Sequence, residues 1–85
     1  MMAESERFHF TKAEPEKQVV FRGGPGVLRI TNTGPARIIV RNGKNNLTLG
    51  VATQAEIDHD GETVVTMDLS DPNDHTSGTM GNRHH

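Results

Sequence analysis

Short runs of alternating apolar and polar residues, separated by Gly, Pro and Asn, constrain the fold of this chain more than any other feature of its sequence. The runs lie between residues 19 and 69, and a period of two residues is typical of half-buried β-strands, whereas no run has the spacing of an amphipathic helix. The breaks at residues 22–26, 33–35, 42–46 and 59–61 have the composition of turns. The sequence therefore predicts an all-β fold, a small antiparallel β-sandwich or open barrel of about five to seven short strands with flexible termini.

The two ends of the 85-residue chain are more polar than its middle, and this composition predicts three segments. Residues 1–16 form an N-terminal arm, residues 17–70 form the β-domain, and residues 71–85 form a flexible C-terminal tail. Phe8 and Phe10 stand out in the arm because they alternate as in a short strand. Their rings would suit a contact with a neighbouring subunit, and the alternative is a frayed arm.

The supply of apolar residues for a core is small. Apolar residues make up 32% of the chain and aromatic residues 4%, and Trp, Tyr and Cys are absent, so neither large anchors nor disulfides reinforce the domain. Small domains commonly gain stability from oligomerisation, a metal or a partner, and we expect a homo-oligomer, either a trimer or a dimer. The expected core consists of Leu28, Ile30, Ile38, Val40, Leu47, Leu49, Val51, Ile57, Val65, Met67 and Leu69.

Charge is sorted along the chain into a basic block and an acidic block. From Lys17 to Lys44 there are six basic residues and no acid, whereas from Glu56 to Asp74 there are seven acids and no Lys or Arg. Apolar alternation within both blocks indicates a folded surface rather than a charged tail. A surface with opposite poles favours association, either with copies of itself or with a charged partner.

Strand pairing that keeps the apolar residues on one side assigns each block to its own sheet face. A first hairpin, which pairs Ile30 with Ile38, leaves arginines around Ile39, and a second hairpin that turns at residues 59–61 leaves carboxylates around Val64. The predicted partner-binding residues are Arg29, Arg37, Ile39, Arg41, Glu56, Asp58, Val64 and Asp68. The alternative is that both are ordinary solvated faces, on which arginine stems shield the sheet.

Catalytic, metal-binding and nucleic-acid-binding functions have little support in the sequence. No nucleophile elbow, phosphate loop or dinucleotide fingerprint occurs, so we expect no enzyme, no catalytic residue and no cofactor. Residues 58–60 are interpreted as part of a turn rather than a metal site, and residues 68–74 as a turn, because they lack the central Gly and closing Glu of a calcium loop. The basic block contains one aromatic residue, Phe21, too few for the stacking that single-stranded nucleic acid requires.

The sequence also bears on the location of the protein. It has no apolar signal-peptide core at its N-terminus, and no apolar run reaches the roughly 20 residues that span a bilayer. We expect a cytoplasmic or virion location. The final Arg83-His84-His85 is either native or the remnant of a purification tag.

Together these observations predict a non-catalytic, self-assembling structural or protein-interaction module, whose basic and acidic sheet faces mediate association. The alternative is a small inhibitor-type protein whose charged face blocks the binding groove of a partner. The biological source, the partner and the subunit number do not follow from the sequence.

Overall fold

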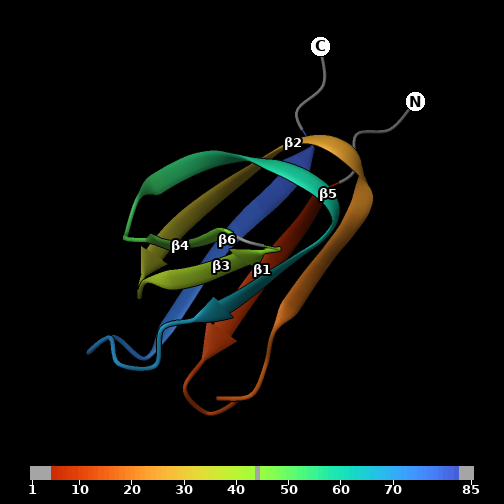
Figure 1. The fold of residues 1–85 in the computed structure, drawn as a ribbon. Helices are drawn as coiled ribbons and strands as arrows, with labels where there is room; N and C mark the ends of the chain where they lie inside the picture. Colours follow the sequence, from red (N-terminus) through yellow and green to blue (C-terminus); the bar gives the residue numbers. More distant parts are fainter. Residues whose placement is uncertain (1–4, 44, 83–85) are drawn as a thin grey trace.

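The structure, a computed structural model, describes residues 5–43 and 45–82. These residues form two antiparallel four-stranded sheets packed together, which confirms the all-β expectation (Figure 1). The six strands are β1 (Ser5–Thr11), β2 (Val19–Pro35), β3 (Ile38–Asn42), β4 (Asn45–Leu49), β5 (Thr53–Met67) and β6 (His75–Asn82).

Two long strands belong to both sheets. The hydrogen-bonded order is β1-β6-β2-β5-β3-β4, and Figure 1 shows β2 and β5 arching over together from one layer to the other. One sheet, here called the β1 sheet, contains β1, β6, the C-terminal part of β2 and the N-terminal part of β5. The other, here called the β4 sheet, contains β4, β3 and the remaining parts of β5 and β2. The two inner faces enclose the core.

A β-bulge in β2 replaces the loop predicted at residues 22–26. Between the pairs Gly23↔Gly61 and Gly26↔His59, β2 advances by three residues while β5 advances by two. The additional residue reverses the inward and outward alternation of β2. Phe21, before the bulge, and Leu28, after it, are both buried, whereas seven residues of regular strand would place them on opposite faces.

The turn predicted at residues 59–61 is also wrong, because β5 runs through this segment without interruption. Gly61 has a φ of 98°, a conformation that glycine adopts without steric cost, and it continues the ladder opposite Gly23. The composition of residues 59–61 is typical of a turn, but their backbone continues the antiparallel pairing of β5 with β2.

The first predicted hairpin is corrected as well. Ile30 pairs with Ala55 of β5 and Met80 of β6 rather than with Ile38. Ile38 pairs with Leu49 of β4 and with Met67 of β5. β2 and β3 therefore follow each other in the chain but are separated by β5 in the sheet.

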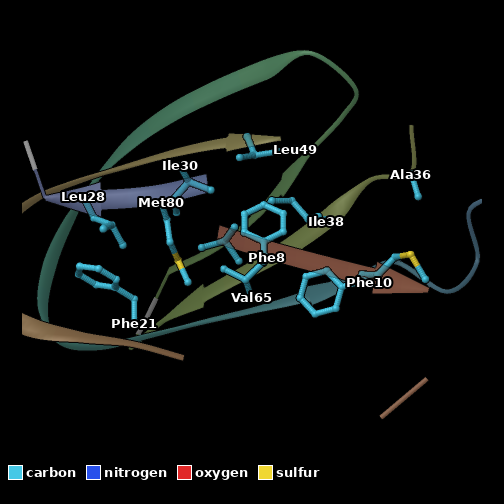
Figure 2. Packing of buried hydrophobic residues seen from close by; sticks show 12 residues of the cluster. Phe8, Phe10, Phe21, Leu28, Ile30, Ala36, Ile38, Leu49, Val65 and Met80 are labelled. Atoms are coloured by element: carbon cyan, nitrogen blue, oxygen red, sulfur yellow. The ribbon is translucent and has the colours of Figure 1, made fainter. Parts of the chain in front are cut away.

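The core agrees in large part with the predicted residues. Of the predicted set, Val51 and Leu69 are wrong, since they are 57% and 45% exposed, and Leu47 and Ile57 are partly buried against the cluster. The buried apolar residues are Phe8, Phe10, Phe21, Leu28, Ile30, Ala36, Ile38, Val40, Leu49, Val65, Met67 and Met80. Figure 2 shows most of this cluster in the space between the strands.

The segment predicted as an N-terminal arm contains an edge strand whose aromatic residues complete the core. Phe8 and Phe10 are 3% and 1% exposed, and their ring centroids lie 5.6 Å apart within the cluster (Figure 2). The prediction that these rings pack on a neighbouring subunit is therefore wrong. Burial of a Phe side chain contributes about 1.5–3 kcal/mol, so β1 supplies a large part of a core that has only three aromatic rings.

The predicted flexible tail is wrong over β6, which lies between β1 and β2 inside the β1 sheet; residues 83–85 of that prediction are outside the described residues. Its inward side carries Thr76 and Met80, at 0% and 1% exposed, and the small Gly78 between them. A Cβ atom at Gly78 would collide with the backbone oxygen of Thr31 and with the ring of Phe8. Glycine is required here because Phe8 lies directly across it.

A buried asparagine joins the turns at one end of the sandwich. Asn32 is 0% exposed, and the two N–H groups of its Nδ2 are shared among three backbone oxygens at N–O distances of 2.9–3.0 Å. Its Oδ1 accepts hydrogen bonds from Thr76 Oγ1 at 2.7 Å and from the Gly34 N–H at 3.1 Å. The three backbone oxygens belong to Ala36, Leu49 and Gly50. One side chain thus links segments that follow β2 and β4 and the start of β6.

Candidate functional site: an outer sheet face and a terminal pocket

The basic and acidic blocks meet each other within one chain. Because β2 pairs with β5, Arg29 lies opposite Glu56 and Arg22 lies opposite Glu62. The first pair has an N–O distance of 2.8 Å and the second 3.1 Å. Oppositely charged residues on neighbouring strands stabilise a sheet by about 0.2–1 kcal/mol per pair. The sorting of charge along the sequence is therefore used, at least in part, for pairing inside the fold.

The eight predicted partner-binding residues are divided between two surfaces. Arg29 and Glu56 form their ion pair on the outer face of the β1 sheet, and Asp58 lies further along the same side of β5. The remaining five occupy the outer face of the β4 sheet, and they are Arg37, Ile39, Arg41, Val64 and Asp68. The predicted basic and acidic faces thus merge into one mixed face.

The centre of this outer face of the β4 sheet is apolar. Val64 lies between Val20 of β2 and Arg41 of β3, and in the next row Ile39 lies beside Thr66. Val20, Ile39 and Val64 are only half-buried, although they face away from the core. We call this surface, made of Val20, Ile39, Arg41, Val64 and Thr66, the central patch. An ion pair closes it at each end: Arg22–Glu62 at one end and Arg37–Asp68 at the other.

The loop between β5 and β6 uses its acids as hydrogen-bond acceptors. Asp68 accepts from the hydroxyl and the N–H of Ser70, and Asp71, which is 4% exposed, accepts from the N–H and side chain of Asn73. Such bonds to the residue two positions on are typical of Asx turns. This confirms the interpretation of residues 68–74 as a turn.

The same contacts lower the pKa of both carboxyls. The hydroxyl and N–H of Ser70, helped by the Arg37 guanidinium, hold the pKa of Asp68 below its ordinary value. The N–H of Asn73, the N–H of Arg37 and the charge of Arg37 do the same for the pKa of Asp71. Arg37 Nε lies 3.2 Å from Asp68 Oδ2 and 3.4 Å from Asp71 Oδ2, so one guanidinium fastens the loop to the start of β3.

A pocket of about 530 Å³ opens beside the β2 bulge. Sequence reasoning missed this site, because it treated residues 22–26, 42–46 and 59–61 as three unrelated turns. The bulge of β2, the end of β3 with Gly43, the first residue of β4 and the middle of β5 meet there. The described lining residues are Pro25, Gly26, Val27, Asn42, Gly43, Asn45, Asp58 and His59.

A hydrogen-bonded network forms one wall of this pocket. Asn42 Nδ2 donates to the backbone oxygen of Asp58 and to Thr63 Oγ1, each at 2.9 Å. Thr63 Oγ1 lies 2.7 Å from His59 Nδ1, and the ring of Phe21 packs edge-on against the imidazole with centroids 5.3 Å apart. His59 is 2% exposed, and its Nε2 is buried without a hydrogen-bond partner among the described residues.

His9 and Ser77, which the sequence placed in two separate terminal segments, are paired across β1 and β6. His9 Nδ1 lies 2.6 Å from Ser77 Oγ on the exposed outer face of the β1 sheet. A catalytic serine needs a base that is itself oriented by a third group, together with a site for the developing oxyanion. We therefore interpret this pair as a cross-strand surface hydrogen bond.

Within residues 5–43 and 45–82, no three His, Cys, Asp or Glu side chains are grouped so that they could hold a metal ion. This part of the chain also contains no helix with the length and apolar character to cross a bilayer. Comparison of the chain with protein-family models, with curated proteins and with solved structures found no match.

Proposed function

We propose that this protein is a non-catalytic interaction module that associates with a second copy of itself through the outer face of the β4 sheet. The observation that carries the proposal is the composition of the central patch. Three branched apolar side chains, Val20, Ile39 and Val64, stand on adjacent strands on the side of the sheet that faces away from the core.

Charge complementarity favours a second copy as the partner. Each end of the central patch carries one arginine and one carboxylate, so a two-fold axis can bring an arginine of one copy near a carboxylate of the other. An interface of this kind is isologous and closes as a dimer. Arg41 adds a cation that forms no ion pair with the described residues and can meet a carboxylate of the partner.

The size of the face predicts a weak dimer. Four strands about 4.8 Å apart and five residues long at about 3.3 Å per residue give a face of roughly 19 by 16 Å. Two copies joined through it would bury roughly 600 Å² in total, which is below the roughly 1,200–2,000 Å² of stable specific interfaces. We therefore expect association in the micromolar range or weaker, which depends on protein concentration and persists in moderate salt because the centre is apolar.

Two matched variants test the face. Thr66 lies in the central patch and Thr31 lies at the corresponding central position of the β1 sheet, and both are half-buried and face outward. Sedimentation velocity from low micromolar to near-millimolar protein should show mass above 9.3 kDa for the wild type and for Thr31→Glu, but a monomer for Thr66→Glu. The proposal would be refuted if the wild type stayed monomeric at all of these protein concentrations, or if both variants associated equally.

The inhibitor-type alternative has less support from the geometry. It needs a surface of one charge, acidic or basic, that is free to occupy an oppositely charged groove on a partner. Glu56, Glu62 and Asp68 are each engaged by an arginine of the same chain, which leaves a mixed surface of nearly balanced charge.

A further inference from the structure

The pocket beside the β2 bulge has the dimensions of a small-molecule site. Its volume of about 530 Å³ lies within the range of roughly 300–1,000 Å³ typical of such sites. None of its described lining residues belongs to the central patch, although Asn42 directly follows Arg41 in the chain. A ligand there would be a function separate from the proposed dimer.

The pocket walls are held in place by packing and hydrogen bonds. The Asn42 amide is fixed by two hydrogen bonds to β5, and the imidazole of His59 is fixed by Thr63 on one side and by Phe21 on another. A wall that is already ordered loses little conformational entropy when a ligand binds, and such preorganisation favours affinity.

His59 leaves one hydrogen bond of this wall unmade. The two nitrogens of a neutral imidazole are one N–H donor and one lone-pair acceptor. Nδ1 makes its hydrogen bond with Thr63 Oγ1. Nε2 is buried without a partner among the described residues, and an unmet buried polar atom costs about 1–3 kcal/mol. This atom is enclosed by protein, so the few polar contacts that a small-molecule site offers its ligand would come here from Asp58, Asn42 and Asn45.

The charge of the lining selects the chemical class of the ligand. Asp58 is exposed at the rim and forms no ion pair with a described residue, and no described lining residue is basic. Asn42 and Asn45 add amide oxygens, which accept hydrogen bonds. Pro25 and Val27 supply apolar surface on the opposite, β2 side of the pocket.

We propose that this pocket binds a small organic amine with an apolar body. The ammonium group of the ligand lies against the Asp58 carboxylate, and its N–H groups donate to the amide oxygens of Asn42 and Asn45. The apolar body packs on Pro25 and Val27. A ligand of this class matches both the carboxylate and the apolar wall, whereas an anion would be repelled by Asp58.

Phenethylamine and its neutral analogue 2-phenylethanol are suitable probes, because they share the apolar body and differ in the amine. Titration of ¹⁵N-labelled protein at low salt should show saturable amide shifts at Gly26, Val27, Asn45 and Asp58 with phenethylamine, with a millimolar dissociation constant. The binding of 2-phenylethanol should be at least fivefold weaker. Shifts that fail to saturate, or equal binding of the two probes, would overturn the proposal.

Two carboxylate variants assign the charge recognition to one residue. Asp58 and Glu56 lie two residues apart on the same side of β5, but Glu56 is held by Arg29. Asp58→Asn should weaken phenethylamine binding at least tenfold, while Glu56→Gln should leave it within twofold. Unchanged binding by Asp58→Asn would contradict the proposal, and the spectra of both variants report directly whether the fold is intact. Sedimentation of Asp58→Asn keeps the ligand site and the dimer distinguishable, because this variant should associate as the wild type does.

Discussion

Replacement of Asn32 by alanine should destabilise the protein more than any other single substitution of a polar residue described above. The side chain has five hydrogen-bonding partner groups and is 0% exposed. Alanine would leave three backbone oxygens, the Thr76 hydroxyl and the Gly34 N–H without these partners. It would also open a small cavity.

The magnitude follows from these five groups. If each loses about 0.6–1 kcal/mol, the loss of unfolding free energy is about 3–5 kcal/mol. An 85-residue domain has a total stability of about 4–13 kcal/mol at the usual 0.05–0.15 kcal/mol per residue. Asn32→Ala should therefore remove a large fraction of the stability, whereas Asn46→Ala, on the exposed edge strand β4, should change it by less than about 0.5 kcal/mol.

Urea denaturation followed by far-UV circular dichroism measures both variants, since the chain lacks Trp and Tyr for fluorescence. With an m-value of about 1 kcal/mol/M, Asn32→Ala should lower the midpoint by several molar or unfold the protein without urea. Asn32→Asp, which keeps the shape but loses the donors, should be similarly unstable. A loss below about 1 kcal/mol for Asn32→Ala would refute the reasoning that these hydrogen bonds hold the end of the sandwich together.

Three further outcomes are expected. Gly78→Ala should lower the melting temperature by about 8–16 °C, because a Cβ there collides with neighbouring atoms and about 2 kcal/mol corresponds to that shift in a domain of this size. Gly50→Ala should be near neutral, because a Cβ there meets nothing within 4 Å. Phe10→Ala should cost about 3–5 kcal/mol of unfolding free energy in the same urea assay, and a smaller loss than 1 kcal/mol would show that β1 is dispensable. The pKa of Asp71 is lowered in the folded state, first by the N–H of Asn73, so its contribution to stability is complete above the ordinary pKa of 3.8 and is lost as pH falls through the lower folded value. Asp71→Asn should therefore be less stable than the wild type at neutral pH and converge with it below pH 3.8, and a pH-independent difference would contradict this assignment.

The residues that face the core were predictable from local alternation. Ile57, Val65 and Met67 were assigned to the inner side on the assumption of a hairpin between them, and they lie there in one uninterrupted strand. Either geometry keeps odd-numbered residues on one side, because the side-chain period of a strand is two regardless of its partner. The prediction of which face a side chain occupies could therefore be correct even though the predicted strand pairing was wrong.

Strand pairing was not predictable, because it depends on contacts between distant parts of the chain. Arg29 meets Glu56, 27 residues away, and nothing in the composition of either block fixes that register. The turn signal at Gly61 is local and was overridden by pairing with β2. β6 was missed for a different reason: its inward side uses Thr76 and Gly78, small residues that fit beneath Phe8 but resemble a disordered tail in composition.

The pairing of β1 with β6 decides how the protein responds to force. Ser5 and Gly81 face each other at the end of this ladder, so tension applied through the two ends of the described chain pulls at right angles to the strands. The interstrand hydrogen bonds of an antiparallel pair lie along that direction, and they are loaded one after another instead of together. A tether through both ends would peel β1 from β6 at low force and draw Phe8 and Phe10 out of the core. Mechanical unfolding of the sandwich would therefore begin at the edge strand β1.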